Sequence, residues 1–149
     1  DTFHFPDGMI GAKLEENFGS EIDGSTGQHP GTDSPGAAKF ADMVGGAFDA
    51  TSPFTPESYD AAALIMLAMQ AANSAEPGDY KSKVMDVANA PGELIYPGEL
   101  GKALDILAAG GEIDYVGATA VELIGPGESA GNYRQIEVSG GKISTVKYR

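Results

Sequence analysis

Residues 52–74, SPFTPESYDAAALIMLAMQAANS, carry the clearest structural signal in the chain. Thr55 suits the N-cap position of a helix, Pro56 suits the first helical position, and Glu57 favours the positive end of the helix dipole. Residues 59–72 are apolar on nearly every side of such a helix. A helix of this kind is usually buried against a sheet or between layers. We therefore expect a central helix over residues 55–72 that other elements cover on several sides.

The rest of the chain alternates between helix and strand signals. Apolar residues at helical spacing predict further helices over residues 9–18, 37–48, 78–90 and 98–109. Shorter runs predict strands over residues 2–5, 21–28 and 120–124, with a loop over residues 29–35. Elements mixed in this order indicate an α/β layer structure. The strands are too few to cover five helices, so we expect the sheets to be completed by chain outside these residues.

The last segment, residues 132–149, has the period-two pattern of a β-hairpin. Its turn is expected at residues 139–141, where two glycines follow a serine. Ile136 and Val138 would lie on one arm, and Ile143 and Val146 on the other.

Composition excludes several classes of function. The 149 residues suffice for one domain with a hydrophobic core. The net charge of −13, with no cluster of Lys or Arg, argues against a nucleic-acid partner. The absence of cysteine excludes disulfides, thiolate catalysis and cysteine metal sites. The longest apolar run, residues 61–69, is far shorter than the roughly 20 residues of a membrane span. Because the chain opens at Asp1, we expect a mature product or a fragment with a signal peptide upstream.

Asp7 is the most suggestive single residue. It lies in the stretch FHFPDGMIG, residues 3–11, where Pro6 ends a short strand-like run. In open α/β sheets, ligands bind at the carboxyl ends of strands, and Asp7 falls at such a position. An aspartate is also typical of a simple turn or of the cap of the helix beginning near Met9. The residues alone leave both interpretations open.

No enzyme signature is present. His4 and His29 are the only histidines, and their spacing matches no metal motif. The loop DGSTGQHPGTD, residues 23–33, lacks the pattern of a phosphate loop and that of a calcium loop. We therefore predict no catalytic residue, no metal and no cofactor, and we treat Asp23 as a structural residue. A hydrolase that pairs Asp7 with a histidine is the enzyme alternative, and it predicts loss of turnover when the histidine is replaced.

Two stretches together resemble a known family. One is residues 52–74, with Phe54 five positions before Tyr59-Asp60-Ala61-Ala62. The other is GKALDILAAGGEIDYVGATAVELIGPGESAGNYRQIEVSGGKI, residues 101–143. They are similar to the C-terminal part of the periplasmic substrate-binding proteins for branched-chain amino acids, which serve ABC importers. The resemblance implies the type I periplasmic-binding fold, with Rossmann-like three-layer lobes, and covers about the last two-fifths of a typical member.

The resemblance also implies a division of the chain and a ligand site. Residues 1–29 would end the second lobe, residues 30–131 would form part of the first lobe, and residues 132–149 would return to the second as a hairpin. Hinge crossings would lie at residues 29–35 and near Asn132. Asp7 would hold the α-ammonium of an amino acid. Phe54 would pack on the ligand side chain, although it is equally suited to pack only on the helix start.

The implied function is that of a binding protein, not an enzyme. It would bind a branched-chain amino acid or a related zwitterion in the periplasm and deliver it to an ABC permease in the inner membrane. The family's carboxylate-binding Ser/Thr loop would lie upstream of Asp1, so this chain would hold half of the site. The alternative is a ligand-sensing regulatory or receptor domain of the same fold. Apolar surface left uncovered would favour self-association of the chain.

Overall fold

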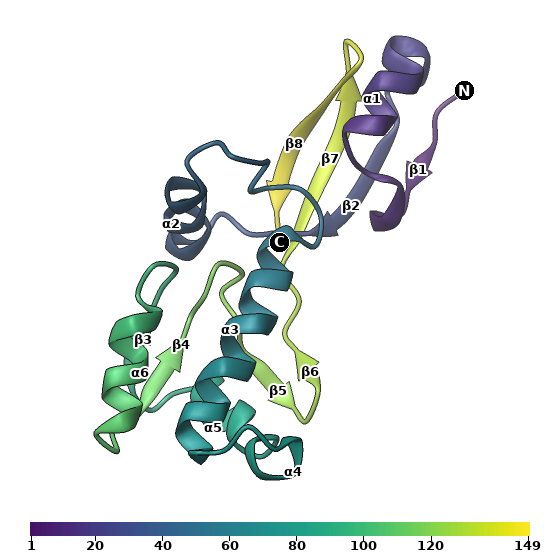
Figure 1. The fold of residues 1–149 in the computed structure, drawn as a ribbon. Helices are drawn as coiled ribbons and strands as arrows, with labels where there is room; N and C mark the ends of the chain where they lie inside the picture. The colour runs from purple at the N-terminus through teal and green to yellow at the C-terminus, as the bar shows by residue number, and fades with distance from the viewer.

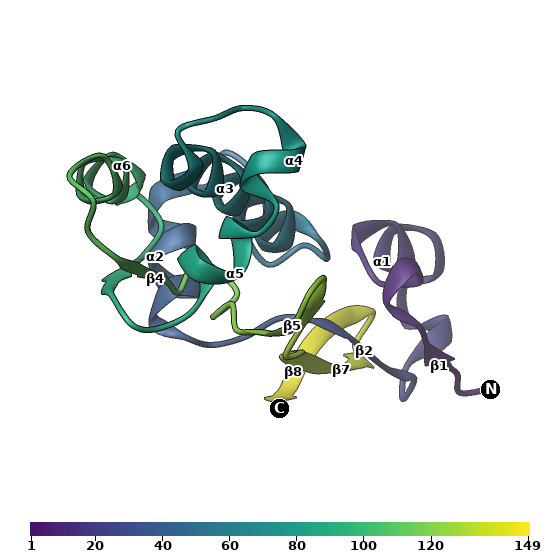
Figure 2. The same cartoon turned by 90° about the horizontal axis from the view of Figure 1, so that it is seen from below.

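The computed structural model describes all residues from 1 to 149, and the chain folds into two packed units (Figures 1 and 2). The sheet unit comprises residues 1–30 and 133–149, and the helical unit comprises residues 35–129. The chain passes between them twice, at residues 31–34 and 130–132. Whether these units are the lobes implied by the resemblance stays a prediction.

The sheet unit is a four-stranded sheet with one short helix on it. Its elements are β1 (His4–Phe5), η1 (Asp7–Met9), α1 (Ala12–Phe18), η2 (Gly19–Ile22), β2 (Thr26–Pro30), β7 (Tyr133–Ser139) and β8 (Lys142–Tyr148). The strand order is β1-β2-β7-β8; β1 and β2 are parallel, and the other pairs are antiparallel. Helix α1 packs on one face, over a core of Phe5, Ile10, Leu14, Ile22, Ile136 and Val138.

The hairpin turn is the predicted glycine pair. Gly140 and Gly141 have φ of +59° and +73°, which two-residue type I′ turns require and glycine adopts readily. Asp23 accepts hydrogen bonds from both backbone N–H groups, at 3.1 and 2.9 Å, so it has the structural role expected of it. Val146 lies on the second arm, as predicted. The register shifts beside it, which leaves Val146 unpaired in a bulge and half exposed.

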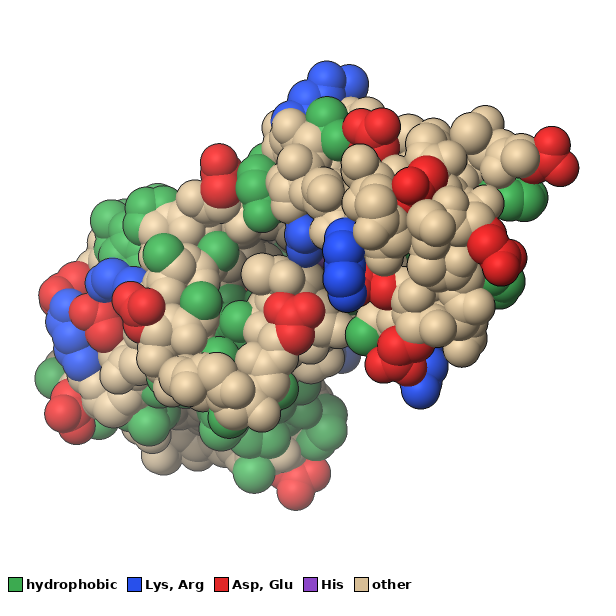
Figure 3. Space-filling model, turned by 90° about the horizontal axis from the view of Figure 1, so that it is seen from above, with side chains coloured by type: hydrophobic (Ala, Val, Ile, Leu, Met, Phe, Trp, Pro, Cys, Tyr) green, Lys and Arg blue, Asp and Glu red, His purple; other side chains and the backbone are tan.

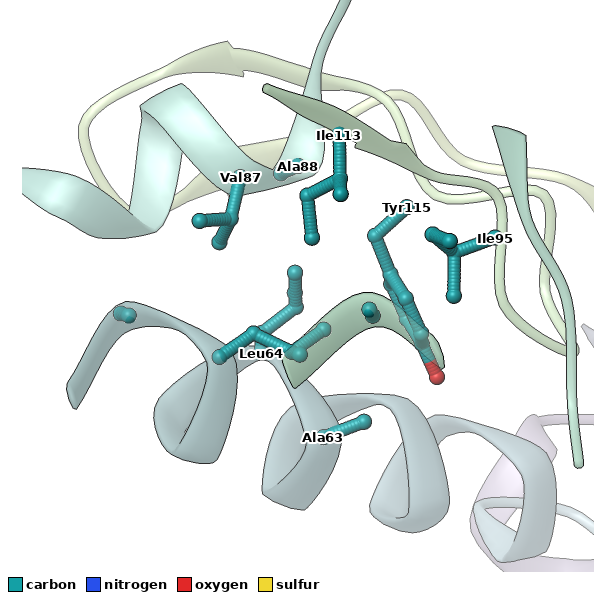
Figure 4. Packing of buried hydrophobic residues seen from close by; sticks show 10 residues of the cluster. Ala63, Leu64, Val87, Ala88, Ile95, Ile113 and Tyr115 are labelled. Carbon is teal, nitrogen blue, oxygen red and sulfur yellow. The ribbon is translucent and has the colours of Figure 1, made fainter. Parts of the chain in front are cut away.

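The helical unit is built around one long helix. Its elements are α2 (Pro35–Val44), α3 (Thr55–Ala72), α4 (Pro77–Tyr80), α5 (Lys83–Ala88), β3 (Glu93–Ile95), α6 (Leu100–Ala108), β4 (Ile113–Tyr115), β5 (Leu123–Gly125) and β6 (Glu128–Ser129). The two strand pairs are β3-β4, which is parallel, and β5-β6, which is antiparallel. One face of α3 packs against α5 and α6, and Ile95, Ile113 and Tyr115 complete this core (Figure 4).

Asp60 is the polar centre of the helical unit. Its side chain is buried in α3, with 2% of its surface exposed. Its Oδ1 accepts hydrogen bonds from the Tyr115 hydroxyl at 2.9 Å and from the Ala118 N–H at 2.8 Å. Its Oδ2 accepts from the N–H and the hydroxyl of Thr119, at 2.8 and 2.7 Å. Burial, together with the Asp60 carboxylate, raises the pKa of Tyr115, which therefore stays a hydrogen-bond donor. Gly117 has φ of +61°, and a Cβ there would collide with the Asp60 carboxylate.

The predicted elements match the structure in part. The helix over residues 55–72 is confirmed. The helix expected over 78–90 is two short helices, and the one expected over 37–48 ends at Val44 because Gly45 adopts a left-handed conformation. Strands β3 and β4 were not predicted. The strand expected over 21–28 lies at Thr26–Pro30, so His29 lies in the sheet and not in a loop.

The prediction that α3 is covered on several sides is wrong for this chain. Ile65 and Met66 are 42% and 50% exposed, and Leu94 and Leu104 are also exposed. Strands β3 and β4 pair only with each other. In the space-filling view, apolar side chains gather mainly over the part that contains the helical unit (Figure 3). The fold thus leaves apolar faces open around its central helix.

Replacing Asp60 by Asn tests the polar centre. The amide NH₂ would face backbone N–H groups that need an acceptor. We expect the free energy of unfolding to fall by about 2–4 kcal/mol, measured by urea denaturation of the full-length protein that carries this chain. The control is Asp86→Asn, which removes only the exposed pair with Lys83, and a change within about 0.5 kcal/mol is expected there. Equal stability of the two variants would contradict the assigned role.

The open apolar faces predict self-association of the 149-residue chain when it is expressed alone. We expect light scattering after size-exclusion chromatography to give a mass above the monomer value of 15.3 kDa. The double variant Ile65→Glu/Met66→Lys should shift the chain towards the monomer, because it places charges on the exposed side of α3. A monodisperse monomer of the unaltered chain would contradict this prediction.

Candidate functional site

The candidate site lies where the carboxyl ends of two parallel strands meet. Asp7 directly follows Pro6 at the end of β1, and Gly31 follows the end of β2, its parallel neighbour. A cavity of about 270 Å³ opens at this part of the sheet unit. It is lined by residues 10–12 before and in α1, by residues 49 and 51–53 before α3, and by His29 and Arg134 in the sheet. Both units therefore contribute to its wall.

Asp7 is exposed at the first position of η1. Its Oδ1 accepts a hydrogen bond from the Gly8 N–H at 2.7 Å. Turn formation thus accounts for one carboxylate oxygen, and no protein group bonds the other. Asp7 does not line the cavity itself, but Ile10 and Gly11 do. The carboxylate therefore sits on a fixed turn beside the cavity.

Phe54 occupies the N-cap position of α3, so the N-cap predicted at Thr55 lies one residue too late. Its φ is +69°, a left-handed conformation that is unfavourable for a bulky side chain. Its carbonyl accepts hydrogen bonds from the N–H and the hydroxyl of Ser58, at 2.9 and 2.6 Å, which hold this conformation. The side chain is 47% exposed. Strained residues of this kind concentrate at binding sites.

His29 forms part of the cavity wall, a position that sequence reasoning missed. It is buried in β2, and its ring Nδ1 lies 2.6 Å from the Pro30 carbonyl oxygen, to which it donates. Burial is the main cause that lowers the pKa of His29, and the Arg134 charge lowers it further. The ring is therefore neutral at neutral pH. The sequence of β2, Thr-Gly-Gln-His-Pro, shows no apolar alternation that would have marked His29 as buried.

Arg134 and residues 49–51 form a second group that sequence reasoning missed. The Arg134 Nε donates to the Thr145 hydroxyl at 2.8 Å, and its Nη1 donates to the Thr51 hydroxyl at 3.2 Å. The Thr51 hydroxyl donates in turn to Asp49 Oδ1 at 2.8 Å. No sequence motif marks these residues, because the contacts join positions far apart in the chain.

The two crossing segments are bonded to each other and to the helical unit. The Gly31 N–H donates to the Asn132 carbonyl at 3.0 Å, and the Asn132 side-chain amide donates to the Thr119 carbonyl at 3.2 Å. Glu57 borders a cavity of about 120 Å³ at this place, and its buried Oε2 has no hydrogen-bond partner. Burial, and secondarily the negative charge of Asp60, raise the pKa of Glu57.

The rest of the molecule offers fewer functional features. No three His, Asp or Glu side chains are grouped so as to hold a metal ion. None of the helices combines the length and the hydrophobicity that crossing a membrane requires. The largest cavity, of about 490 Å³, lies between α5, the end of α6 and the start of β4. It contains none of Asp7, His29, Phe54 and Arg134. We therefore place the candidate site at the cavity of about 270 Å³, which residues of both units line.

Comparison with known proteins supports the fold. No protein-family profile matches the chain. A stretch of 73 residues is 38% identical to BasB of Halobacterium salinarum, the substrate-binding protein of a chemotactic signal transduction system, and covers 48% of this chain and 18% of that protein. The structure matches the crystal structure of a leucine-binding protein, LivK, from Thermotoga maritima, with a TM-score of 0.70 and 14% identity over 99% of this chain and 37% of that one. The expected fold is confirmed: the chain has the architecture of part of a type I periplasmic-binding protein.

Glu57 predicts a pH dependence of stability. Because its folded pKa is raised, the folded state holds the proton more tightly than the unfolded state. Stability should therefore fall as the pH rises from the ordinary Glu value of about 4.3 through the raised value. Glu57→Gln should melt above the unaltered protein at neutral pH, with a difference that shrinks towards pH 4. The control is Glu21→Gln at an exposed position. A pH-independent difference for Glu57→Gln would contradict the prediction.

Proposed function

We propose that this chain is the C-terminal part of an extracytoplasmic solute-binding protein that holds a small amino acid-like ligand between two lobes. Residues 1–29 and 132–149 would belong to one lobe, and residues 30–131 to the other. The observation that carries the proposal is the cavity at the carboxyl edge of the sheet, which residues of both units line. Asp7 precedes its lining residues 10–12 in the chain, and Phe54 directly follows its lining residue Pro53.

The chemistry of the two residues suits a zwitterion with an apolar side chain. The free oxygen of Asp7 is an acceptor for an ammonium group, and the Gly8 N–H keeps the carboxylate in place. The half-exposed ring of Phe54 supplies an apolar surface on the opposite unit. Support comes from the two similar proteins, of which one binds leucine and the other is a substrate-binding protein. The carboxylate of the ligand would be bound by chain outside these residues.

Binding would be coupled to closure of the two units around the ligand. The crossings at residues 31–34 and 130–132 are the places where the backbone can bend. In the periplasm, the closed form would dock on an ABC permease of the inner membrane and release its ligand. No step of this cycle involves chemistry on the ligand, so the protein would not be an enzyme.

A second candidate is a sensor of the same ligands. The similarity to BasB favours it, because that protein serves chemotactic signal transduction. A sensor would bind in the same way but pass the closed form to a receptor. Deleting the gene separates the two: loss of uptake of labelled ligand supports the importer, and loss of a behavioural response with intact uptake supports the sensor.

Asp7→Asn tests the ammonium contact. Removing one partner of a desolvated charge pair costs roughly 2–5 kcal/mol, which corresponds to at least about thirtyfold weaker binding. Isothermal titration of the full-length protein should begin with L-leucine and continue with other amino acids, amides, ureas and small carboxylates. Because Asp7 is exposed, the melting temperature without ligand should not change. Asp42→Asn, at an exposed position in α2 away from the crossings, is the control.

Two results would count against the proposal. Unchanged affinity in Asp7→Asn would remove Asp7 from the site. If the unaltered protein binds none of the compounds, the proposal of an amino acid-like ligand is wrong. The hydrolase alternative predicts turnover of amide or ester substrates that is lost in His4→Ala or His29→Ala.

A further inference from the structure

We propose that Thr51 and Arg134 form a latch that holds the helical unit against the sheet unit and positions Phe54 for the ligand. The hydrogen bond between the Arg134 guanidinium and the Thr51 hydroxyl, 3.2 Å long, is the one side-chain to side-chain bond that joins the two units. The latch is inferred from this contact alone and does not depend on any ligand. Its effect on ligand affinity rests on the proposed function.

The sheet side of the latch is rigid. Arg134 lies in β7, next to the antiparallel strand β8. Its Nε donates to the Thr145 hydroxyl on β8 at 2.8 Å, which fixes the direction of the guanidinium. The planar group can then present Nη1 to a partner outside the sheet unit at little cost in side-chain entropy.

The helical side is a short segment with its own internal hydrogen bonds. Asp49 Oδ1 accepts from both the N–H and the hydroxyl of Thr51, each at 2.8 Å. The Thr55 N–H donates to the Ser52 carbonyl at 3.1 Å. Residues 49–55 therefore move together, and a displacement of Thr51 also displaces Phe54.

Charge makes the bond stronger than its exposure suggests. The Thr51 hydroxyl accepts from a cation and donates to an anion, so it lies between Arg134 and Asp49. Hydrogen bonds to ionised groups are shorter and stronger than neutral ones, and a chain of such bonds polarises its members. The bond is nevertheless exposed to water, unlike the bonds around Asp60, and water can replace it when the units separate.

The crossing segments provide the contrast. The bonds of Asn132 to Gly31 and Thr119 lie where the chain itself passes between the units. Gly31 and Asn132 stay close in any arrangement of the units, because they directly adjoin Pro30 and Tyr133, which are paired in the sheet. The Thr51–Arg134 contact has no such covalent support and depends on the angle between the units. This contact is therefore a latch, whereas Asn132 lies at the pivot.

The test measures the distance between the units without any ligand. The chain contains no cysteine, so Ser144→Cys on β8 and Asp105→Cys on α6, both exposed, provide the label sites within it. Pulsed electron paramagnetic resonance on the spin-labelled full-length protein should give one narrow distance distribution. Thr51→Val should broaden it and move it to longer distances. Thr51→Ser, which keeps the hydroxyl, should restore the narrow distribution.

Thr26→Val is the matched control. The Thr26 hydroxyl bonds the His4 ring at 3.0 Å within the sheet unit, so the same substitution removes an exposed bond that does not join the units. Its distance distribution should equal that of the unaltered protein. A Thr51→Val distribution identical to that of the unaltered protein would overturn the latch. Equal broadening by Thr26→Val would overturn it as well.

L-leucine titration adds a separate readout. We expect Thr51→Val to bind L-leucine roughly threefold to tenfold more weakly, the effect of losing about one hydrogen bond. Thr51→Ser should bind as the unaltered protein does. Unchanged affinity in Thr51→Val would overturn the positioning of Phe54. If the unaltered protein does not bind L-leucine or its analogues, the proposed function fails, and the distance measurement alone decides on the latch.

Discussion

The Asp60 carboxylate determines how the parts of the molecule are arranged. A buried carboxylate is costly unless donors replace the water that it loses, and four donors surround this one. Because three of the four come from Ala118 and Thr119, the first turns of α3 are fixed to the loop that follows β4. The same loop contacts Asn132, where the chain returns to the sheet unit. The position of Phe54 and the path of the second crossing therefore both depend on Asp60.

The candidate site has no continuous stretch of sequence. Asp7 comes from the first strand, Phe54 from the start of α3, and Arg134 from β7. Asp7 and Phe54 are held by hydrogen bonds within their own turns, and Arg134 is held by Thr145 on the neighbouring strand. The two units meet through their packing and through the Arg134–Thr51 hydrogen bond. A site of this type is rigid in its parts and adjustable as a whole, which suits a protein that closes on a ligand.

Sequence reasoning succeeded where the signal is local. The proline at the start of α3 and the apolar residues 59–72 predicted that helix, although its N-cap is Phe54 and not Thr55. The glycine pair predicted the hairpin turn. Strands β3 and β4 were not predicted, because three residues each are too few to show the alternation of apolar and polar residues that marks a strand. The bulge at Val146 was not predicted, because nothing in the sequence distinguishes a bulge from a regular strand. His29, Thr51 and Arg134 come together only in the folded chain, so no sequence motif identifies them as residues of the candidate site.

The order of the strands has a consequence for the way the chain matures. Strand β2 is hydrogen-bonded to β7, and the whole helical unit lies between them in the sequence. During synthesis, the core around Phe5 and Leu14 cannot be completed until Ile136 and Val138 have been made. By then the helical unit already has nearly all of its own core contacts. Pairing across so long a loop is slow, since the entropy of closing it is lost before any contact forms. The sheet unit is thus the last part to fold, and loss of the final hairpin would remove Ile136 and Val138, its two most deeply buried core residues.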